Sequence, residues 1–296
     1  MINFKKLTLQ DIDIVRKYLS VPTTRSCDNT VGCTMMWRNY FKTEFATFDD
    51  TAIFKAVYLD YPVAFATPIG KNVAGALDAI WDYCNKHGVS MVICFATESD
   101  VQKIGSRFKI KVIKENGWSD YIYRAEDLAF LAGRKFSGQR NHINRFKREN
   151  PVYELKPIDA TTIPDVREFF TEFCELYKKD SEMYRAEEDI VFEVLDNYEL
   201  YGQSGLVLYA GGRVAAFAIG EVLGDTLFVH IEKADTRYAG SYQMIASEFV
   251  KKHIDLGIKY VNREEDLGDE GLRKSKLQYH PCAFIDKFTV FVEQKI

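Results

Sequence analysis

The chain has 296 residues and a formal net charge of -4 at pH 7, with 47% hydrophobic and 28% charged residues. This length and composition predict an ordinary globular protein of one large or two medium domains. The small net charge excludes a protein drawn to nucleic acid or membrane by its overall field, so such contacts must come from a local patch. No apolar run approaches the roughly 20 residues that span a bilayer, which leaves at most peripheral membrane contact.

The six cysteines are scattered along the chain and include no C-x-x-C pair. In a chain of this length without a signal peptide, that pattern predicts reduced thiols and a cytoplasmic protein. We therefore expect neither a disulfide framework nor a bound metal.

The first half of the chain alternates strand-like apolar runs with amphipathic helices. Helical spacing joins Ile12, Val15 and Leu19, and residues 21–50 are irregular and rich in aromatic side chains, which we interpret as core. The elements expected after them are strands at 53–58 and 62–67, a helix at 73–86, a strand at 91–95, a short helix at 100–106, and strands at 110–113 and 121–123.

Residues 128–150 are basic, with apolar side chains interleaved. A helix from about Gln139 would place Ile143 and Phe146 on one side and cations on the neighbouring faces. Two interpretations stay open: a solvated connector, or a cationic helix for a polyanion such as tRNA or a lipid headgroup. The residues that would bind the polyanion are Arg140, Asn144, Arg145 and Arg148.

The second half repeats the alternation of helices and strands. Pro164 follows Thr162 at the start of a helix, as is common in a first helical turn. The remaining expected elements are a strand near 152–155, a helix at about 187–198, a meander of strands at 205–209, 214–221 and 226–231, a helix from Tyr242 through Lys252, and a strand at 258–262.

The turn before the helix at Tyr242 is a candidate anion site. Its sequence from Arg237 to Tyr242 is RYAGSY. The first N–H groups of a helix lack intrahelical partners and favour phosphate, and an arginine adds a bidentate cation. The hexapeptide resembles the Q/R-x-x-G-x-G/A pyrophosphate loop of the GNAT acyltransferases, except that Tyr242 replaces a small residue. A plain strand-to-helix turn is the alternative.

The order of elements suggests an internal repeat, with chance agreement of two α/β patterns as the alternative. In this interpretation Ala74-Gly75 corresponds to Ala239-Gly240, and Gly88 corresponds to Gly257. The first copy lacks the arginine of the anion loop, which suggests a scaffold or acceptor-binding half. We expect a degenerate first domain at 1–127, a basic connecting segment at 128–150, and a second domain at 151–296 that carries the donor site.

Three segments carry a wider resemblance: RKFSGQRNHINRFKR at 134–148, HIEKADTRYAGSYQ at 230–243 and VNREEDLGDEGLRKSKLQYHP at 261–281. They resemble the family related to the C-terminal domain of phosphatidylglycerol lysyltransferase, which is more distantly similar to the Fem-type aminoacyltransferases. The resemblance implies an α/β (α+β) fold of tandem GNAT-like domains, with mixed, mostly antiparallel sheets and flanking helices. The membrane-embedded part of the lysyltransferase is absent from this sequence.

The resemblance implies acyl or aminoacyl transfer from acyl-coenzyme A or aminoacyl-tRNA to an amine or hydroxyl acceptor, which is a small molecule or a lipid. Such a reaction needs a held donor, a base and donors for the oxyanion. Glu232 or Glu264 is the candidate base, and Asn262, Arg273 and Lys276 would orient the acceptor. Backbone N–H groups near Glu232 and Lys233 would bind the acyl oxygen. The expected donor-phosphate residues are Arg237, Tyr238, Ala239, Gly240, Ser241 and Tyr242.

Three hypotheses stay open for the function. The basic segment favours a transferase that uses aminoacyl-tRNA, and the anion loop favours one that uses acyl-coenzyme A. The third is a non-catalytic phospholipid- or nucleic-acid-binding protein on the same fold. Tyr279 is the tyrosine nearest to the place where many GNAT enzymes carry a general acid, and a core position is equally compatible with it.

Overall fold

The computed structural model describes residues 2–22, 24–177 and 180–296. Its contacts divide the chain into two compact units, and neither unit is continuous in sequence. The first unit comprises 1–120, 265–273 and 284–296, and the second comprises 121–264 and 274–283. Over the described residues, no helix combines the length and apolarity needed to cross a membrane.

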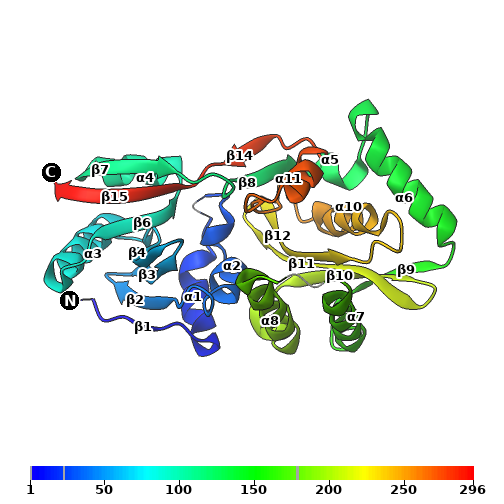
Figure 1. Ribbon diagram of the computed structural model, residues 1–296, viewed down its shortest axis with the longest axis horizontal. Helices are drawn as coiled ribbons and strands as arrows, with labels where there is room; N and C mark the ends of the chain where they lie inside the picture. The colour runs from blue at the N-terminus through cyan, green and yellow to red at the C-terminus, as the bar shows by residue number, and fades with distance from the viewer. Residues whose placement is uncertain (1, 23, 178–179) are drawn as a thin grey trace. The chain divides into compact units, whose positions relative to one another are not determined.

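The first unit is built on an eight-stranded sheet (Figure 1). Its strands run in the order β1-β2-β3-β4-β6-β15-β7, and β5 pairs with β3 outside this path. The strand bounds are Lys5–Lys6 for β1, Glu44–Phe48 for β2, Thr51–Tyr58 for β3, Tyr61–Phe65 for β4, Ile69–Gly70 for β5, Met91–Ala96 for β6, Phe108–Lys114 for β7 and Phe288–Lys295 for β15.

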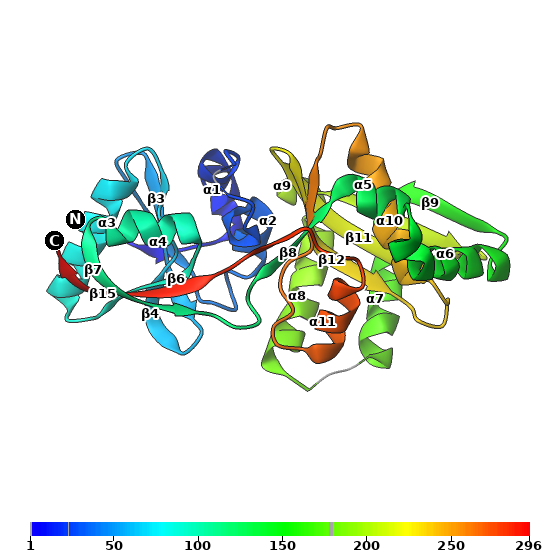
Figure 2. The same ribbon diagram turned by 90° about the horizontal axis from the view of Figure 1, so that it is seen from above.

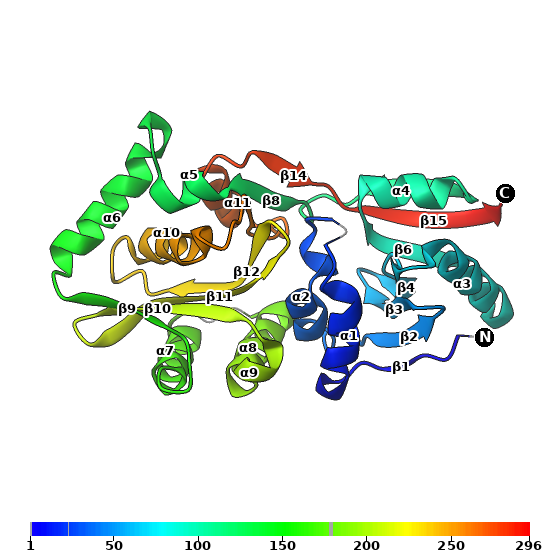
Figure 3. The ribbon, with the colours of Figure 1, turned by 180° about the vertical axis from the view of Figure 1, so that it is seen from behind.

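Helices cover both faces of this sheet. The α-helices are α1 (Ile12–Leu19), α2 (Val31–Met36), α3 (Val73–His87) and α4 (Glu98–Gly105), with 3-10 turns at Leu9–Asp11 and Cys27–Asn29. Figure 3 shows α3 and α4 away from α1 and α2, with strands between them. Side chains alternate accordingly along β6: Met91 and Ile93 join the core beneath α3, whereas Val92 and Cys94 join a second core with Tyr58.

The second unit is built on a seven-stranded sheet in the order β14-β8-β13-β12-β11-β10-β9. Its strand bounds are Asp120–Arg124 for β8, Tyr153–Pro157 for β9, Ser204–Ala210 for β10, Arg213–Leu223 for β11, Thr226–Ala234 for β12, Tyr260–Asn262 for β13 and Ala283–Ile285 for β14. Most of its pairings are antiparallel, as expected, and β12 and β13 pair in parallel.

Helices of the second unit also lie on both faces. The bounds are Ala125–Phe130 for α5, Ser137–Glu149 for α6, Ile163–Leu176 for α7, Glu182–Asp196 for α8, Tyr198–Tyr201 for α9 and Ser241–Ile254 for α10, with a 3-10 turn at Arg134–Phe136. The helix α11 (Glu270–Leu277) begins in the first unit and ends in the second, which includes its residues from 274. α7 and α8 lie on the face of the sheet opposite α10 (Figure 1), and α5 and α6 pack against α10 (Figure 2).

Both units contain a strand, a helix and a parallel strand. In the first, α3 connects β4 to β6, which pair in parallel at Phe65 and Ile93. In the second, α10 connects β12 to β13. The two units therefore share the local arrangement on which the predicted repeat rests.

The strands of each sheet are not consecutive in the chain. β15, the last strand, lies between β6 and β7 and is antiparallel to both. β8, which follows β7 in sequence, instead joins the second sheet beside β13. The domain boundaries expected from the sequence, at 127 and 150, divide the chain into consecutive segments. They do not describe a last strand that returns to the first sheet.

Candidate functional site

A bulge on β12 shapes the centre of the second unit. The register with β11 moves from Ile219 opposite Ile231 to Gly220 opposite Val229, which leaves His230 as the extra residue. A Cβ at Gly220 would lie 2.1 Å from the carbonyl oxygen of Phe228, so only glycine fits opposite the bulge. The bulge sets the direction of His230 and of the side chains that follow it.

His230 is held between two carboxylates. Its Nδ1 lies 2.8 Å from Oε1 of Glu264, its Nε2 lies 2.9 Å from Oε1 of Glu221, and the side chain is 1% exposed. Burial by itself lowers the pKa of His230, but the two carboxylates outweigh it and raise the pKa to about 10. His230 is therefore an imidazolium at neutral pH, and it fixes one oxygen of Glu264.

Glu232, two residues further along β12, forms an ion pair with Arg263. Nη2 of Arg263 donates to Oε1 of Glu232 at 2.6 Å, and both side chains are largely buried. The Arg263 guanidinium lies 4.9 Å from the ring centroid of Tyr279 and 6.0 Å from that of Tyr123. Its Nη1 is buried and has no hydrogen-bond partner among the described residues. A buried donor left in this way is suited to an oxygen of a bound ligand.

The backbone of β12 is open beside this pair. β13 pairs with β12 at Thr226, Leu227 and Phe228 and then ends at Asn262. β12 continues to Ala234 with β11 on its other side, and no described strand pairs with its β13 side beyond Phe228. A strand edge that no neighbouring strand covers is a place where proteins bind extended ligands.

The three residues expected to orient an acceptor make contacts within the protein. Asn262 is fully buried, and its Oδ1 accepts a hydrogen bond from the N–H of Glu264 at 2.6 Å, which shapes the turn where Glu264 has φ +58°. Nζ of Lys276 donates to the carbonyl oxygen of Arg263 at 2.6 Å. Arg273 makes a two-pronged ion pair with Asp266 within the first unit. Asn262 and Lys276 thus lie at the site and support its backbone.

The predicted anion loop already contains an anion. The Asp235 carboxylate, which is 3% exposed, binds the backbone N–H, Nε and Nη2 of Arg237 at 2.7–3.0 Å. Burial tends to raise the pKa of Asp235, but these bonds to Arg237 outweigh it and lower that pKa. The guanidinium of Arg237 is therefore already paired with a carboxylate of the same loop.

The rest of the loop is packed and bonded internally. The N–H of Tyr238 and Oγ of Ser241 both donate to the carbonyl oxygen of Asp235. Gly240 has φ +89°, and a Cβ there would lie 2.1 Å from the carbonyl oxygen of His142 in α6. Tyr242 packs against the core and burial raises its pKa to about 12, whereas Ala239 is partly exposed. Gly240 is therefore required by the close approach of α6.

A hollow of about 420 Å³ lies next to Arg237, and its charged lining is mainly acidic. Lys233 does not add a cation there, because its Nζ binds Glu187 of α8 at 2.7 Å. The carboxylates that line the hollow are Asp165, Glu168, Glu172 and Asp235, with Arg213 and Arg237 as the cations.

The basic helix α6 divides its cations between structural contacts and solvent. Arg140 donates to the carbonyl oxygens of Leu131 and Gly133 at 2.5 and 2.6 Å, which ties the start of α6 to the preceding turn. Arg145 pairs with Glu149 at 2.8 Å, while the side chain of Arg148 is 71% exposed. Asn144 and Lys147 are exposed as well.

Sequence reasoning did not single out Arg263, His230 or Asp235. Arg263 directly follows the strand that ends in Asn262, and the end of a buried strand is a place where open α/β sheets bind ligands. His230 alternates with Glu232 along a predicted strand, which signals a shared face. Asp235 lies two residues before Arg237, but the sequence does not reveal that the two are paired.

Comparison with known proteins agrees with the predicted resemblance. A family model described as phosphatidylglycerol lysyltransferase, C-terminal, matches residues 22–291. The chain belongs to this family. A conserved protein of unknown function from Bacteroides thetaiotaomicron is 32% identical, with a TM-score of 0.90 and coverage of 99% of this chain and 100% of that chain.

More distant members and neighbours share the fold. The structure of L-PGS from Bacillus licheniformis is 15% identical, with a TM-score of 0.64 over 84% of each chain. FemX is 8% identical, with a TM-score of 0.62 over 98% of this chain and 97% of that chain. The predicted α/β fold of two mixed, mostly antiparallel sheets with flanking helices is thus confirmed, and the family is that of the C-terminal part of phosphatidylglycerol lysyltransferase.

An uncharacterised protein of Mycoplasmoides gallisepticum is 23% identical over 204 residues, which is 66% of this chain and 63% of that relative. The match therefore spans less than two thirds of the relative's length.

Proposed function

We propose that the second unit transfers an acyl or aminoacyl group from an activated donor to an amine or hydroxyl acceptor. One observation carries the proposal. Glu232, on the segment of β12 that β13 does not cover, binds one nitrogen of the Arg263 guanidinium, and the other terminal nitrogen, Nη1, has no described hydrogen-bond partner. The acyl carbonyl oxygen gains negative charge when the acceptor attacks. Donors that are fixed before the reaction stabilise that charge.

The side chains of the site then have distinct roles. Arg263 Nη1, with backbone N–H groups near Glu232 and Lys233, binds the acyl oxygen, and Glu232 positions Arg263. Glu264 takes the proton from the attacking amine or hydroxyl, since His230 engages only its Oε1 in the described contacts. The proton then passes to the leaving oxygen or sulfur as its bond to the acyl carbon breaks.

For the donor we propose aminoacyl-tRNA rather than acyl-coenzyme A. The lysyltransferase family to which the chain belongs supports an aminoacyl group. Asp235 neutralises Arg237, and the carboxylates beside it would repel the phosphates of coenzyme A. The exposed cations of α6 offer an alternative surface for a phosphate backbone.

A single-turnover assay tests the reaction. Loss of radiolabelled ester from a mixture of aminoacyl-tRNAs is followed with and without phosphatidylglycerol micelles. Arg263→Lys keeps the charge but loses the planar fork, so we expect a rate about 100-fold lower with unchanged tRNA affinity. The matched control is Arg213→Lys, an exposed arginine paired with Glu172, which should retain the full rate. An Arg263→Lys protein with the wild-type rate would refute the proposal.

Binding measurements test the donor separately. Arg145→Ala with Arg148→Ala should weaken tRNA binding and reduce the slope of log affinity against log salt by about 1–2. A control pair on exposed β7 residues, Lys109→Ala with Lys111→Ala, should leave both unchanged. Micromolar binding of coenzyme A that Arg237→Ala abolishes would instead make acyl-coenzyme A the donor.

A further inference from the structure

The first unit contains a buried ammonium group that three carboxylates share. Nζ of Lys287 lies 2.7 Å from Asp28, 2.7 Å from Asp120 and 3.3 Å from Glu265, and the lysine side chain is fully buried. The thiol of Cys27 lies 3.3 Å from the same Nζ. The residues come from the start, middle and end of the chain, and all belong to the first unit.

Asp28 connects this cluster to a cavity. Its described contacts, with Nζ of Lys287 and Oγ of Ser26, both use Oδ2. Oδ1 takes part in neither contact, and Asp28 lines the cavity. One carboxylate oxygen is thus fixed and the other is available on the cavity side.

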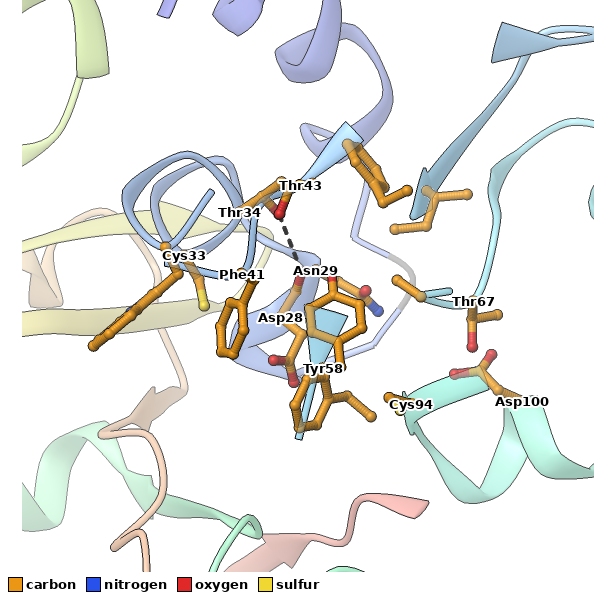
Figure 4. A pocket seen from close by; sticks show the side chains of 15 residues that line it. Asp28, Asn29, Cys33, Thr34, Phe41, Thr43, Tyr58, Thr67, Cys94 and Asp100 are labelled. Atoms are coloured by element: carbon orange, nitrogen blue, oxygen red, sulfur yellow. Dashed lines mark hydrogen bonds between the residues drawn. The ribbon is translucent and has the colours of Figure 1, made fainter. Parts of the chain in front are cut away.

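The cavity has a volume of about 50 Å³, and five of the fifteen residues that line it are aromatic. Figure 4 shows Asp28 beside Phe41 and Tyr58, with Cys33 on one side and Thr67 next to Asp100 on the other. The aromatic residues that line it are Trp37, Phe41, Phe54, Tyr58 and Phe95.

The rings are held in place by one another and by the backbone. The centroid of Phe41 lies 5.1 Å from that of Tyr58 and 6.3 Å from that of Phe95, and Tyr58 lies 5.1 Å from Phe95. Phe95 has φ +56°, an unfavourable conformation for a bulky residue. Strain of this kind persists where the surrounding structure fixes a side chain.

A second polar atom of the lining lacks a partner. Oγ1 of Thr67 is buried and makes no hydrogen bond to any described residue. Asp100, its neighbour in the cavity wall, caps α4 through the N–H and hydroxyl of Thr97. Thr67 is therefore the buried hydroxyl here that a ligand would satisfy.

We propose that this cavity binds a small soluble organic ammonium compound, with its charge on the aromatic faces and on Oδ1 of Asp28. Aromatic faces attract cations that are weakly hydrated, and a carboxylate fixes the charge by hydrogen bonding. The volume suits a group of a few heavy atoms. Thr67 then binds a second polar group of the ligand, as an amino alcohol would supply.

A metal ion fits the lining less well. Side chains of Cys27, Asp28 and Cys33 lie close enough together to ligate one. However, Lys287 already places a positive charge 3.3 Å from the sulfur of Cys27 and 2.7 Å from Asp28. A divalent ion ligated by those atoms would place twice the charge of an ammonium group against Lys287, and it would leave the aromatic lining without a role.

Titrations of the full chain with paired ligands test this proposal. Trp37 lines the cavity, so intrinsic fluorescence reports occupancy. Ethanolamine and methylammonium are compared with ethylene glycol and methanol, which have similar size and no charge. We expect the amines to bind at least about 10-fold more tightly than the neutral compounds. Equal affinities, or no amine binding up to about 100 mM, would overturn the proposal.

Variants locate the bound charge. Asp28→Asn should weaken both amines about 10-fold, whereas Asp286→Asn, which alters a partly exposed carboxylate of the same unit that pairs with Lys114, should not. Because Asp28 also pairs with Lys287, Thr67→Val provides a second test that leaves the buried ion cluster intact. It should weaken ethanolamine more than methylammonium. Zinc binding that Cys33→Ser abolishes, without amine binding, would assign the cavity to a metal instead.

Discussion

Replacement of Gly240 by alanine tests whether this glycine is set by packing rather than by phosphate binding. Gly240 has φ +89°, and an alanine Cβ would lie 2.1 Å from the carbonyl oxygen of His142 and 3.2 Å from Cβ of Phe146. The first of these neighbours is helical backbone, which cannot rotate away. Either the loop or α6 must move.

The magnitude follows from a comparison with Gly257. Gly257 has φ +79°, and no atom lies within 4 Å of the position that a Cβ would take there, so Gly257→Ala carries only the left-handed backbone cost of about 1–2 kcal/mol. Gly240→Ala carries that cost and the overpacking of α6, about 1–3 kcal/mol more. We therefore expect a total loss of about 2–5 kcal/mol for Gly240→Ala.

Urea unfolding followed by far-UV circular dichroism measures both variants. All three tryptophans, Trp37, Trp81 and Trp118, belong to the first unit, so fluorescence reports that unit separately. Equal losses of unfolding free energy for Gly240→Ala and Gly257→Ala would refute the reasoning, because they would mean that α6 does not press on the loop.

Three further predictions concern buried charges and the bulge. Because folding raises the pKa of His230 to about 10, the stabilisation from its two ion pairs is fully present below about pH 6.5 and is lost as pH rises through 10. The free energy of unfolding in urea should therefore fall by a few kcal/mol over that window, and His230→Gln should make the fall smaller. Lys287→Met removes the ammonium group that the buried carboxylates share, and it should lower the free energy of unfolding, measured by tryptophan fluorescence, by about 3–5 kcal/mol. The control Lys114→Met, at an exposed lysine, should lower it by less than about 1 kcal/mol. Gly220→Ala should destabilise the bulge by at least about 1 kcal/mol, measured by circular dichroism, and a neutral effect would contradict the close approach of Phe228.

The sequence predicts the local elements of this fold well where periodicity is strong. The helix expected at 73–86 is observed at Val73–His87, and the strand expected at 91–95 is observed at Met91–Ala96. Both have continuous apolar patterns and a glycine boundary at Gly88, which adopts the left-handed conformation. Local patterns of this kind need no information from distant residues.

Long-range pairing is what the sequence does not reveal. Glu44–Phe48 forms β2 within a segment expected to be irregular, and no element was predicted for β15 at Phe288–Lys295. β15 is a strand because β6 and β7 pair with its two edges, and its own sequence does not identify those partners.

The candidate site follows the same rule. Glu232 and Glu264 could be named from their places after apolar runs. Their partners Arg263 and His230 depend on the bulge and on the end of β13, which are properties of the assembled sheet. Asp235 shows the limit most clearly, because an arginine that suggests a phosphate site is neutralised by a carboxylate two residues away.

The exchanged strand β15 fixes the order in which the chain can complete its folding during synthesis. The strands β1 to β7 of the first unit are made before the whole second unit, yet their sheet lacks a central strand until Phe288–Lys295 has been made. Until then β6 exposes an unpaired edge and β7 has no described partner strand, which invites pairing with other chains. The second sheet is complete once β14 has been made at Ala283–Ile285, so the second unit can finish before β15 is made. The unit whose strands are made first is therefore completed last, and the edges of β6 and β7 stay unpaired until the final strand has been made.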